Sequence, residues 1–241
     1  MKGWVNNVKK NRFEIDMCNG SIMDKLISFS LPLMVSGILQ LAFNAVDIIV
    51  VGRFSGSQAL AAVGSTTALI NVFTNLFIGI SLGANVLAAR FYAAGKDREM
   101  SETVHTSITL ALISGIMMAV IGVLLAKWAL EIMGTPDDVI GQSALYMRIY
   151  FMGMPFFMLY NYGAAILRAI GDTKRPLIFL IISGIANAAL NMILVILFHM
   201  GVAGVAIGTI ISQLISCVLV LTCLYRSEGS LKLYLENEGY T

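Results

Sequence analysis

The 241-residue sequence predicts an all-α membrane protein, and two observations carry this prediction. Hydrophobic residues make up 58% of the chain and charged residues 12%, whereas an average soluble domain carries about 25% charged residues. The uncharged runs are also long: residues 54–89 contain no charged side chain, and residues 177–225 contain none apart from His199. Such continuous runs are typical of membrane helices. They differ from the strands of membrane β-barrels, which alternate apolar and polar residues over short segments.

Six segments of the chain are long and apolar enough to cross a membrane, which takes about 20 mostly apolar residues per helix. Residues 177–225 are too many for one crossing, so we expect the glycines of "FHMGVAG" (198–204) to form a tight hairpin between two spans. The expected spans are residues 26–50, 58–82, 103–126, 145–168, 177–199 and 202–225. They form one predicted transmembrane domain, 26–225, between an N-terminal segment, 1–25, and a C-terminal tail, 226–241.

The basic residues predict the orientation of these spans. Six crossings place both termini on one side of the membrane. All 16 Lys and Arg residues fall on that side except Arg53, Lys127 and Arg148. Because basic loops stay in the cytoplasm, both termini are predicted to be cytoplasmic. The acidic loop "GTPDDV" (134–139) falls on the outer side, in agreement with this orientation.

A single carboxylate interrupts the first span, because Asp47 follows a stretch, 26–46, that has no charged residue. A charge at the bilayer centre costs about 2.5–3.5 kcal/mol on insertion scales, so such a residue normally faces protein or a water-filled cavity. The polar residues on the same helix face are Ser36, Gln40 and Asn44, at helical spacing from Asp47. We therefore predict that this face lines a polar interior, where Asp47 takes up a proton or a cation.

Three further spans carry polar stripes at helical spacing, and lipid would penalise each stripe unless it faced a common interior. The stripes are Thr67, Asn71 and Asn75; Ser183, Asn187 and Asn191; and Thr209, Ser212, Gln213 and Ser216. Ordinary hydrogen bonding between packed helices, worth about 0.6–2 kcal/mol per contact, is the alternative explanation for each Asn, Ser, Thr or Gln. The sequence leaves both interpretations open.

A segment rich in Met and aromatic residues, "MGMPFFMLYNYG" (152–163), is a candidate wall for apolar ligands. Its candidate contacts are Met154, Tyr160 and Asn161. The same segment also fits an ordinary packed helix, in which Pro155 would permit a kink.

The sequence argues against several other classes of function. A net charge of +2 gives no indication of nucleic-acid binding. No nucleophile–base pair or cluster of metal ligands stands out, so we expect neither an enzyme nor a bound cofactor. Cys217 and Cys223 lie in an apolar run without a metal-binding spacing, and we expect them to pack as small hydrophobic residues.

Three stretches together resemble the multidrug and toxic compound extrusion (MATE) transporter family. The family's first helix and following outer loop are similar to "LPLMVSGILQLAFNAVDIIVVGRFSGSQALAAVG" (31–64). Its cytoplasmic turn after the fourth helix is similar to "LRAIGDTKRP" (167–176), and its sixth helix to "GVAGVAIGTIISQ" (201–213). The resemblance runs from about residue 22 to residue 226.

The resemblance implies that the chain is the N-terminal six-helix lobe of a twelve-helix transporter in the cytoplasmic membrane of a prokaryote. Members of the family export amphipathic or cationic compounds in exchange for H⁺ or Na⁺, so the implied partners are such compounds, membrane lipid and a second six-helix lobe. Residues that match the family's coupling-ion site, with Na⁺ as the one possible metal, are Asp47, Asn187, Asn191 and Thr209. Asn191 departs from the usual Asp. Candidate wall residues of the substrate cavity are Gln40, Asn44, Asn71 and Asn75.

Two alternatives remain beside this interpretation. A lipid-linked oligosaccharide flippase of the same superfamily would need cationic side chains in mid-membrane, whereas Arg148 and Arg168 lie near the ends of their predicted span. A non-transporting subunit, or a homo-oligomeric channel, would have similar spans but no coupling between ion and cargo. Substitution of Asp47 by Asn distinguishes coupled efflux from this second alternative.

Overall fold

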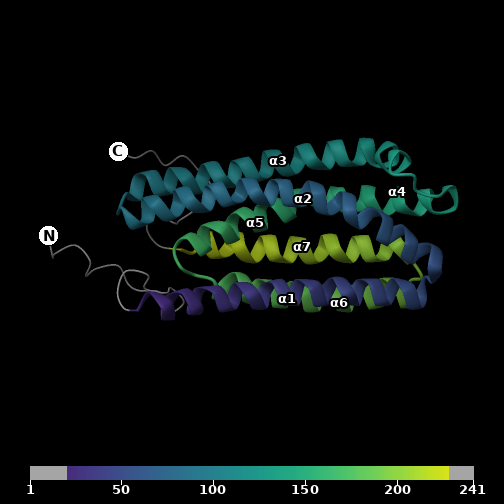
Figure 1. The fold of residues 1–241 in the computed structure, drawn as a ribbon, viewed down its shortest axis with the longest axis horizontal. Helices are drawn as coiled ribbons and strands as arrows, with labels where there is room; N and C mark the ends of the chain where they lie inside the picture. Colours follow the sequence, from purple (N-terminus) through teal and green to yellow (C-terminus); the bar gives the residue numbers. More distant parts are fainter. Residues whose placement is uncertain (1–20, 228–241) are drawn as a thin grey trace.

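The computed structural model describes residues 21–227, and within them the chain is helical and contains no β-strand. Its elements are α1 (Ile22–Phe54), α2 (Gly56–Ala93), α3 (Asp97–Ile132), α4 (Asp137–Met152), α5 (Met154–Ala169), α6 (Lys174–Met192), the π-helix η1 (Ile193–Leu197) and α7 (Gly201–Tyr225). The helices run side by side in one elongated bundle (Figure 1). The predicted all-α fold class is therefore confirmed. Most of the predicted N-terminal segment, 1–25, and tail, 226–241, lies outside the described residues.

Five helical segments are long and apolar enough to cross a membrane, namely α1, α2, α3, α6 with η1, and α7. The predicted fourth span, 145–168, falls instead on two 16-residue helices, α4 and α5, with only Gly153 between them. Pro155 explains the interruption, because it has no N–H to donate to the carbonyl of Phe151 one turn earlier. The N–H of Gly153 instead donates to the carbonyl of Tyr150 over 3.0 Å.

The predicted hairpin near residue 200 lies between η1 and α7. Two residues in it have positive φ, His199 at 52° and Gly201 at 55°. This left-handed conformation reverses the chain within three residues, and glycine adopts it without steric cost. As a result α7 returns antiparallel along α6 and packs against it.

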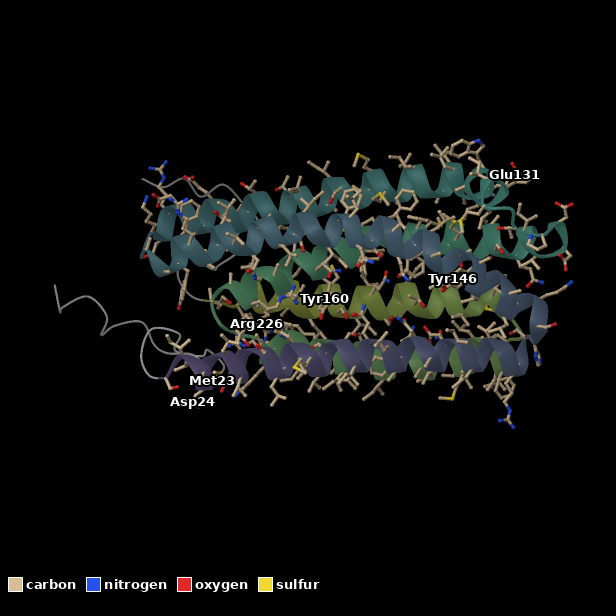
Figure 2. The ribbon with its side chains drawn as sticks, in the orientation of Figure 1. Met23, Asp24, Glu131, Tyr146, Tyr160 and Arg226 are labelled. Atoms are coloured by element: carbon tan, nitrogen blue, oxygen red, sulfur yellow. The ribbon has the colours of Figure 1, made fainter. Side chains whose placement is uncertain are left out.

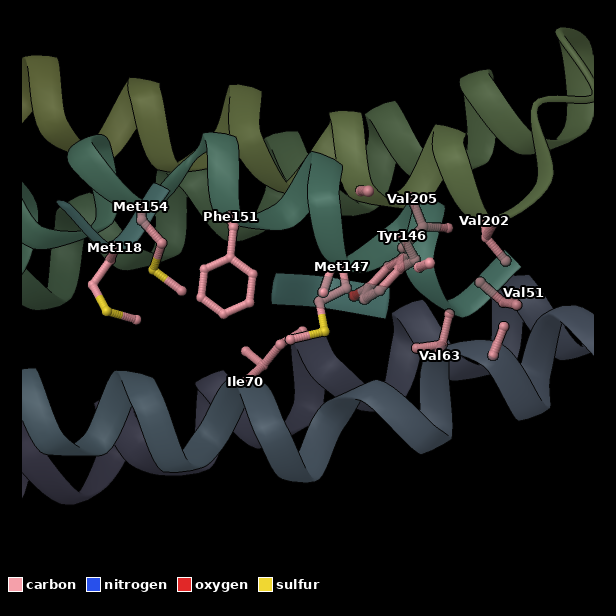
Figure 3. Packing of buried hydrophobic residues seen from close by; sticks show 14 of the residues in the cluster. Val51, Val63, Ile70, Met118, Tyr146, Met147, Phe151, Met154, Val202 and Val205 are labelled. Carbon is pink, nitrogen blue, oxygen red and sulfur yellow. The ribbon is translucent and has the colours of Figure 1, made fainter. Parts of the chain in front are cut away.

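The main apolar core of the bundle is formed mostly by residues of α2, α3, α4, α5 and α7. Figure 3 shows part of its apolar core, in which Phe151 lies among Met147, Met154 and Ile70. Gly122 of α3 makes room for the ring of Phe151, because a Cβ at this glycine would lie 2.2 Å from the ring. The close packing of α3 on α4 therefore depends on a missing side chain.

The first helix is the least buried of the predicted spans. It packs mainly against α6 and also contacts α2 and α7. Leu41 remains 71% exposed and Ile38 65% exposed on its outer side. In a membrane these side chains face lipid or a neighbouring protein, so α1 is held in the lobe by a narrow inner face.

Candidate functional site

A cavity of about 150 Å³, lined by both polar and aromatic side chains, lies between α1, α4, α5, α6 and α7. Its polar lining is supplied by Gln40, Asn44, Asp47, Ser183, Asn187, Thr209, Ser212, Gln213 and Ser216. Asp47 is the one lining residue with a charged side chain. The sequence marked polar stripes on four helices. Those of α1, α6 and α7 line the cavity, and the stripe of α2 does not.

A chain of hydrogen bonds connects Asp47 to α6 and α7. Asn191 Nδ2 donates to Asp47 Oδ1 and, over 3.3 Å, to Asn187 Oδ1. Asn187 Nδ2 in turn donates to Thr209 Oγ1 over 3.4 Å. The structure therefore brings together all four residues that the family resemblance marked as a coupling-ion site.

Burial differs along this chain of hydrogen bonds. Asn191 is fully buried and Asn187 is 6% exposed. Asn191 Oδ1 is buried with no hydrogen-bond partner in the part of the chain that the structure describes.

No Lys or Arg of residues 21–227 forms an ion pair with Asp47. The carboxylate is thus held by a neutral amide.

Helical spacing explains how α1 presents Asp47. Gln40, Asn44 and Asp47 follow one another at i, i+4 and i+7, so all three reach the same cavity. Ser36 departs from the predicted stripe, because its Oγ donates to the carbonyl of Pro32 over 2.8 Å within the same helix. Such a bond to the preceding turn is a common alternative for a helical serine.

Phe43, one turn before Asp47, fixes the contact between α1 and α6. A Cβ built on Gly184 of α6 would lie 2.0 Å from the ring of Phe43. The glycine therefore leaves a notch in α6 that the ring fills. Both residues line the cavity, although the sequence analysis singled out neither.

The opposite wall of the cavity is aromatic. It is formed by Tyr146 and Tyr150 of α4 and by Phe157 and Tyr160 of α5. The ring centroids of Tyr146 and Tyr150 lie 6.1 Å apart, and Tyr160 Oη donates to the carbonyl of Pro176 over 3.2 Å. Figure 2 shows Tyr146 and Tyr160 at separate points along the bundle. Of the four, the sequence predicted only Tyr160, although the i, i+4 spacing of Tyr146 and Tyr150 is a signal for the α4 face.

Four of the predicted wall residues do not line this cavity. Asn71 and Asn75 are exposed on α2, because its opposite face packs into the bundle. Met154 is fully buried in the apolar core, and Asn161 Nδ2 donates to the carbonyl of Phe157 in its own helix over 2.8 Å. A periodic stripe identifies one face of a helix but does not identify what that face meets.

The fold and the cavity together define a multi-pass helical membrane protein with an internal carboxylate in a polar chamber. The family model MatE matches residues 32–193. The chain therefore belongs to the MatE family, the MATE transporters that the sequence resemblance indicated.

Individual relatives support this assignment. The chain is 34% identical over 216 residues to the probable multidrug resistance protein YoeA of Bacillus subtilis, which is 88% of this chain and 47% of that protein. It is 29% identical over 200 residues to YpnP of the same organism, which is 82% of this chain and 44% of that protein. A protein of Shewanella oneidensis named FAD transporter is 24% identical over 200 residues, 80% of this chain and 44% of that protein. The chain spans about half the length of the curated relatives it matches.

Solved structures share the fold. A MATE protein crystallised in the bent conformation matches with a TM-score of 0.84 at 22% identity, over 92% of this chain and 50% of that chain. A MATE protein in the straight conformation matches with a TM-score of 0.79 at 24% identity, over 86% of this chain and 46% of that chain. The observed bundle therefore has the architecture of half a MATE transporter.

Proposed function

We propose that the chain is one lobe of an antiporter that exports amphipathic or cationic compounds across the cytoplasmic membrane in exchange for H⁺ or Na⁺. The observation that carries this proposal is Asp47, a carboxylate inside a polar cavity that is held by the amide of Asn191. A carboxylate paired with a basic side chain would already be neutralised. One held by a neutral amide remains able to exchange a proton or a cation. The names of the relatives YoeA and YpnP support the export of drugs.

The proposed coupling mechanism uses the contact between α1 and α6. Proton or ion binding at Asp47 competes with the hydrogen bond that Asn191 donates to the carboxylate. It therefore favours a different packing of α1, the helix with the narrowest contact to the lobe. Release of the cargo to the outside accompanies this packing. Ion and cargo drive the cycle only because each binds the two packings unequally.

The lining of the cavity supports organic cations as the proposed class of cargo. Its volume of about 150 Å³ is below the roughly 300–1,000 Å³ of drug-sized sites, so a drug needs further space from a second lobe or from an opening of the helices. Aromatic faces opposite a carboxylate suit organic cations, since one cation–π contact contributes about 0.5–2 kcal/mol. The lining contains no Lys or Arg that could hold a pyrophosphate, which disfavours a flippase of lipid-linked oligosaccharides.

The test is efflux of ethidium by the full-length protein in proteoliposomes, driven by an imposed pH or Na⁺ gradient. Asp47→Asn should abolish gradient-driven efflux at unchanged protein level. Asp24→Asn, the same change at an exposed position on the same helix, should leave efflux intact. FAD as cargo should show no driven flux if the carboxylate selects for cations. Equal ethidium efflux by Asp47→Asn and the parent would refute the proposal, and gradient-independent leakage in both would favour a channel.

A further inference from the structure

We infer that Gly208 of α7 is a positioning residue of the coupling site, an inference that rests on the proposed function. Its missing side chain leaves the space in which the amide of Asn191 lies, between α6 and α7. From that space Nδ2 donates to both Asp47 and Asn187. Gly208 itself touches neither ion nor cargo and acts through Asn191.

The geometry at Gly208 is specific to one side chain. A Cβ built there would lie 2.0 Å from Asn191 Oδ1 and 3.2 Å from Asn191 Cγ, but 3.5 Å from the backbone nitrogen of the same residue. The last distance is an ordinary van der Waals contact. A methyl group at position 208 would therefore displace the amide and leave the two helix backbones at their present separation.

The amide of Asn191 is buried and held by hydrogen bonds on two sides. The residue is fully buried, and its nitrogen already donates towards α1 and within α6. Its Oδ1 faces Gly208 and has no hydrogen-bond partner within residues 21–227. Rotation away from a new methyl group would therefore break the bond to Asp47, the bond to Asn187, or both.

Close packing of helices is the simpler explanation for a glycine at this position, because Gly204 and Gly208 form a small-xxx-small pair. The two glycines differ in what they meet. A Cβ at Gly204 would lie 3.1 Å from Met200 Cβ, just before the same helix, and 3.2 Å from Leu194 Cβ of η1, so none of its near atoms belongs to the site. At Gly208 the nearest atom belongs to the site. Gly204 therefore provides a matched control on the same helix.

Helix formation by itself does not favour glycine at position 208. Glycine in a helix interior is about 1 kcal/mol less favourable than alanine. Alanine at 208 should therefore strengthen α7 as a helix while it disturbs the amide. Stability and site geometry are thus expected to respond differently to the same substitution.

The experiment is labelling of Asp47 by dicyclohexylcarbodiimide, which reacts with protonated carboxyl groups in apolar surroundings. The full-length protein in membranes is labelled over a range of pH, and the modified peptide is quantified by mass spectrometry. Gly208→Ala and Asn191→Ala should shift the pH midpoint of labelling in the same direction and by the same amount, about one to two pH units for the loss of one hydrogen bond to a charged group. The double variant should shift it no further. Gly204→Ala should match the parent.

Three results would overturn the inference: a parental midpoint in Gly208→Ala, the same shift in Gly204→Ala, or additive shifts in the double variant. The pH profile of ethidium efflux provides a second readout, in which Gly208→Ala should again behave as Asn191→Ala does. The labelling result does not depend on transport. A protein that fails to export ethidium but shows the shared, non-additive shift would contradict the proposed function and still support the role of Gly208.

Discussion

The contact between Phe43 and Gly184 offers the sharpest test of how α1 is held in the lobe. Gly184→Ala would place a methyl carbon 2.0 Å from the ring of Phe43. Apolar carbon atoms rest about 3.5–4.0 Å apart, so the ring has to move by roughly 1.5–2 Å. Asp47 lies one turn further along the same face of α1, and it would move away from its amide donor on α6 together with the ring.

The size of the effect follows from known overpacking costs. Inserting a methyl group into a tight contact typically costs about 1–3 kcal/mol. Since about 1.4 kcal/mol corresponds to a tenfold change in an equilibrium constant, the population with α1 docked on α6 should fall by roughly 5- to 150-fold. We therefore expect Gly184→Ala to lower both the thermal unfolding midpoint and ion-driven efflux.

Thermal unfolding of the detergent-solubilised full-length protein is the assay, with ethidium efflux measured on the same preparations. Gly141→Ala is the matched control, because a Cβ at this helical glycine meets no atom within 4 Å. Its unfolding midpoint should equal or exceed that of the parent. Phe43→Leu in the Gly184→Ala background should restore part of the loss, since the smaller side chain relieves the overlap. The reasoning fails if Gly184→Ala behaves like Gly141→Ala, or if the second substitution restores nothing.

Two further predictions concern the cytoplasmic turn and the core. Burial raises the pKa of Asp172, although a backbone bond from Arg175 over 3.1 Å and its guanidinium oppose the shift. The folded protein therefore binds this proton more tightly than the unfolded chain does, and the associated stability is lost as pH rises above about 4, the ordinary Asp pKa. Asp172→Asn keeps a side chain that can accept the backbone bond from Arg175. Between pH 4.5 and 8, the thermal unfolding midpoint of this variant should fall less than that of the parent. Parallel curves of midpoint against pH for the two proteins would contradict this prediction. Gly122→Ala should overpack Phe151 and cost about 1–3 kcal/mol relative to Gly141→Ala, and equal midpoints for these two variants would refute the packing argument.

Hydrophobic periodicity was enough to predict the helical class and the cavity-facing side of α1. The stripe of Gln40, Asn44 and Asp47 lines the cavity because one helix face has one set of neighbours. The stripe with Asn71 and Asn75 does not reach this cavity, since α2 packs its other face against α4 and α5. Periodicity carries no information about which helices meet, and that information comes from packing.

The remaining parts of the site depend on contacts that are distant in sequence. Asp47 and Asn191 are separated by 144 positions and meet through the packing of α1 on α6. Their association was predicted from the family resemblance, and spacing within either span does not indicate it. The notch at Gly184 was missed for a related reason. A glycine in a membrane helix indicates a close approach of another group, but the sequence does not name the group that approaches.

The two contacts of α1 with α6 also bear on why the proposed coupling residue, Asp47, lies on the least buried helix. The Phe43 ring in its notch and the bond from Asn191 to Asp47 lie one turn apart on the same face. A hydrogen bond to a charged group contributes about 1.5–3 kcal/mol. In the proposed mechanism, its loss on ion binding would change the docking equilibrium of α1 by roughly 10- to 150-fold, part of the about 10⁴-fold that a complete two-state switch requires. On a helix packed on all sides the same loss would be small beside the total packing energy, and the ion would bind without moving anything.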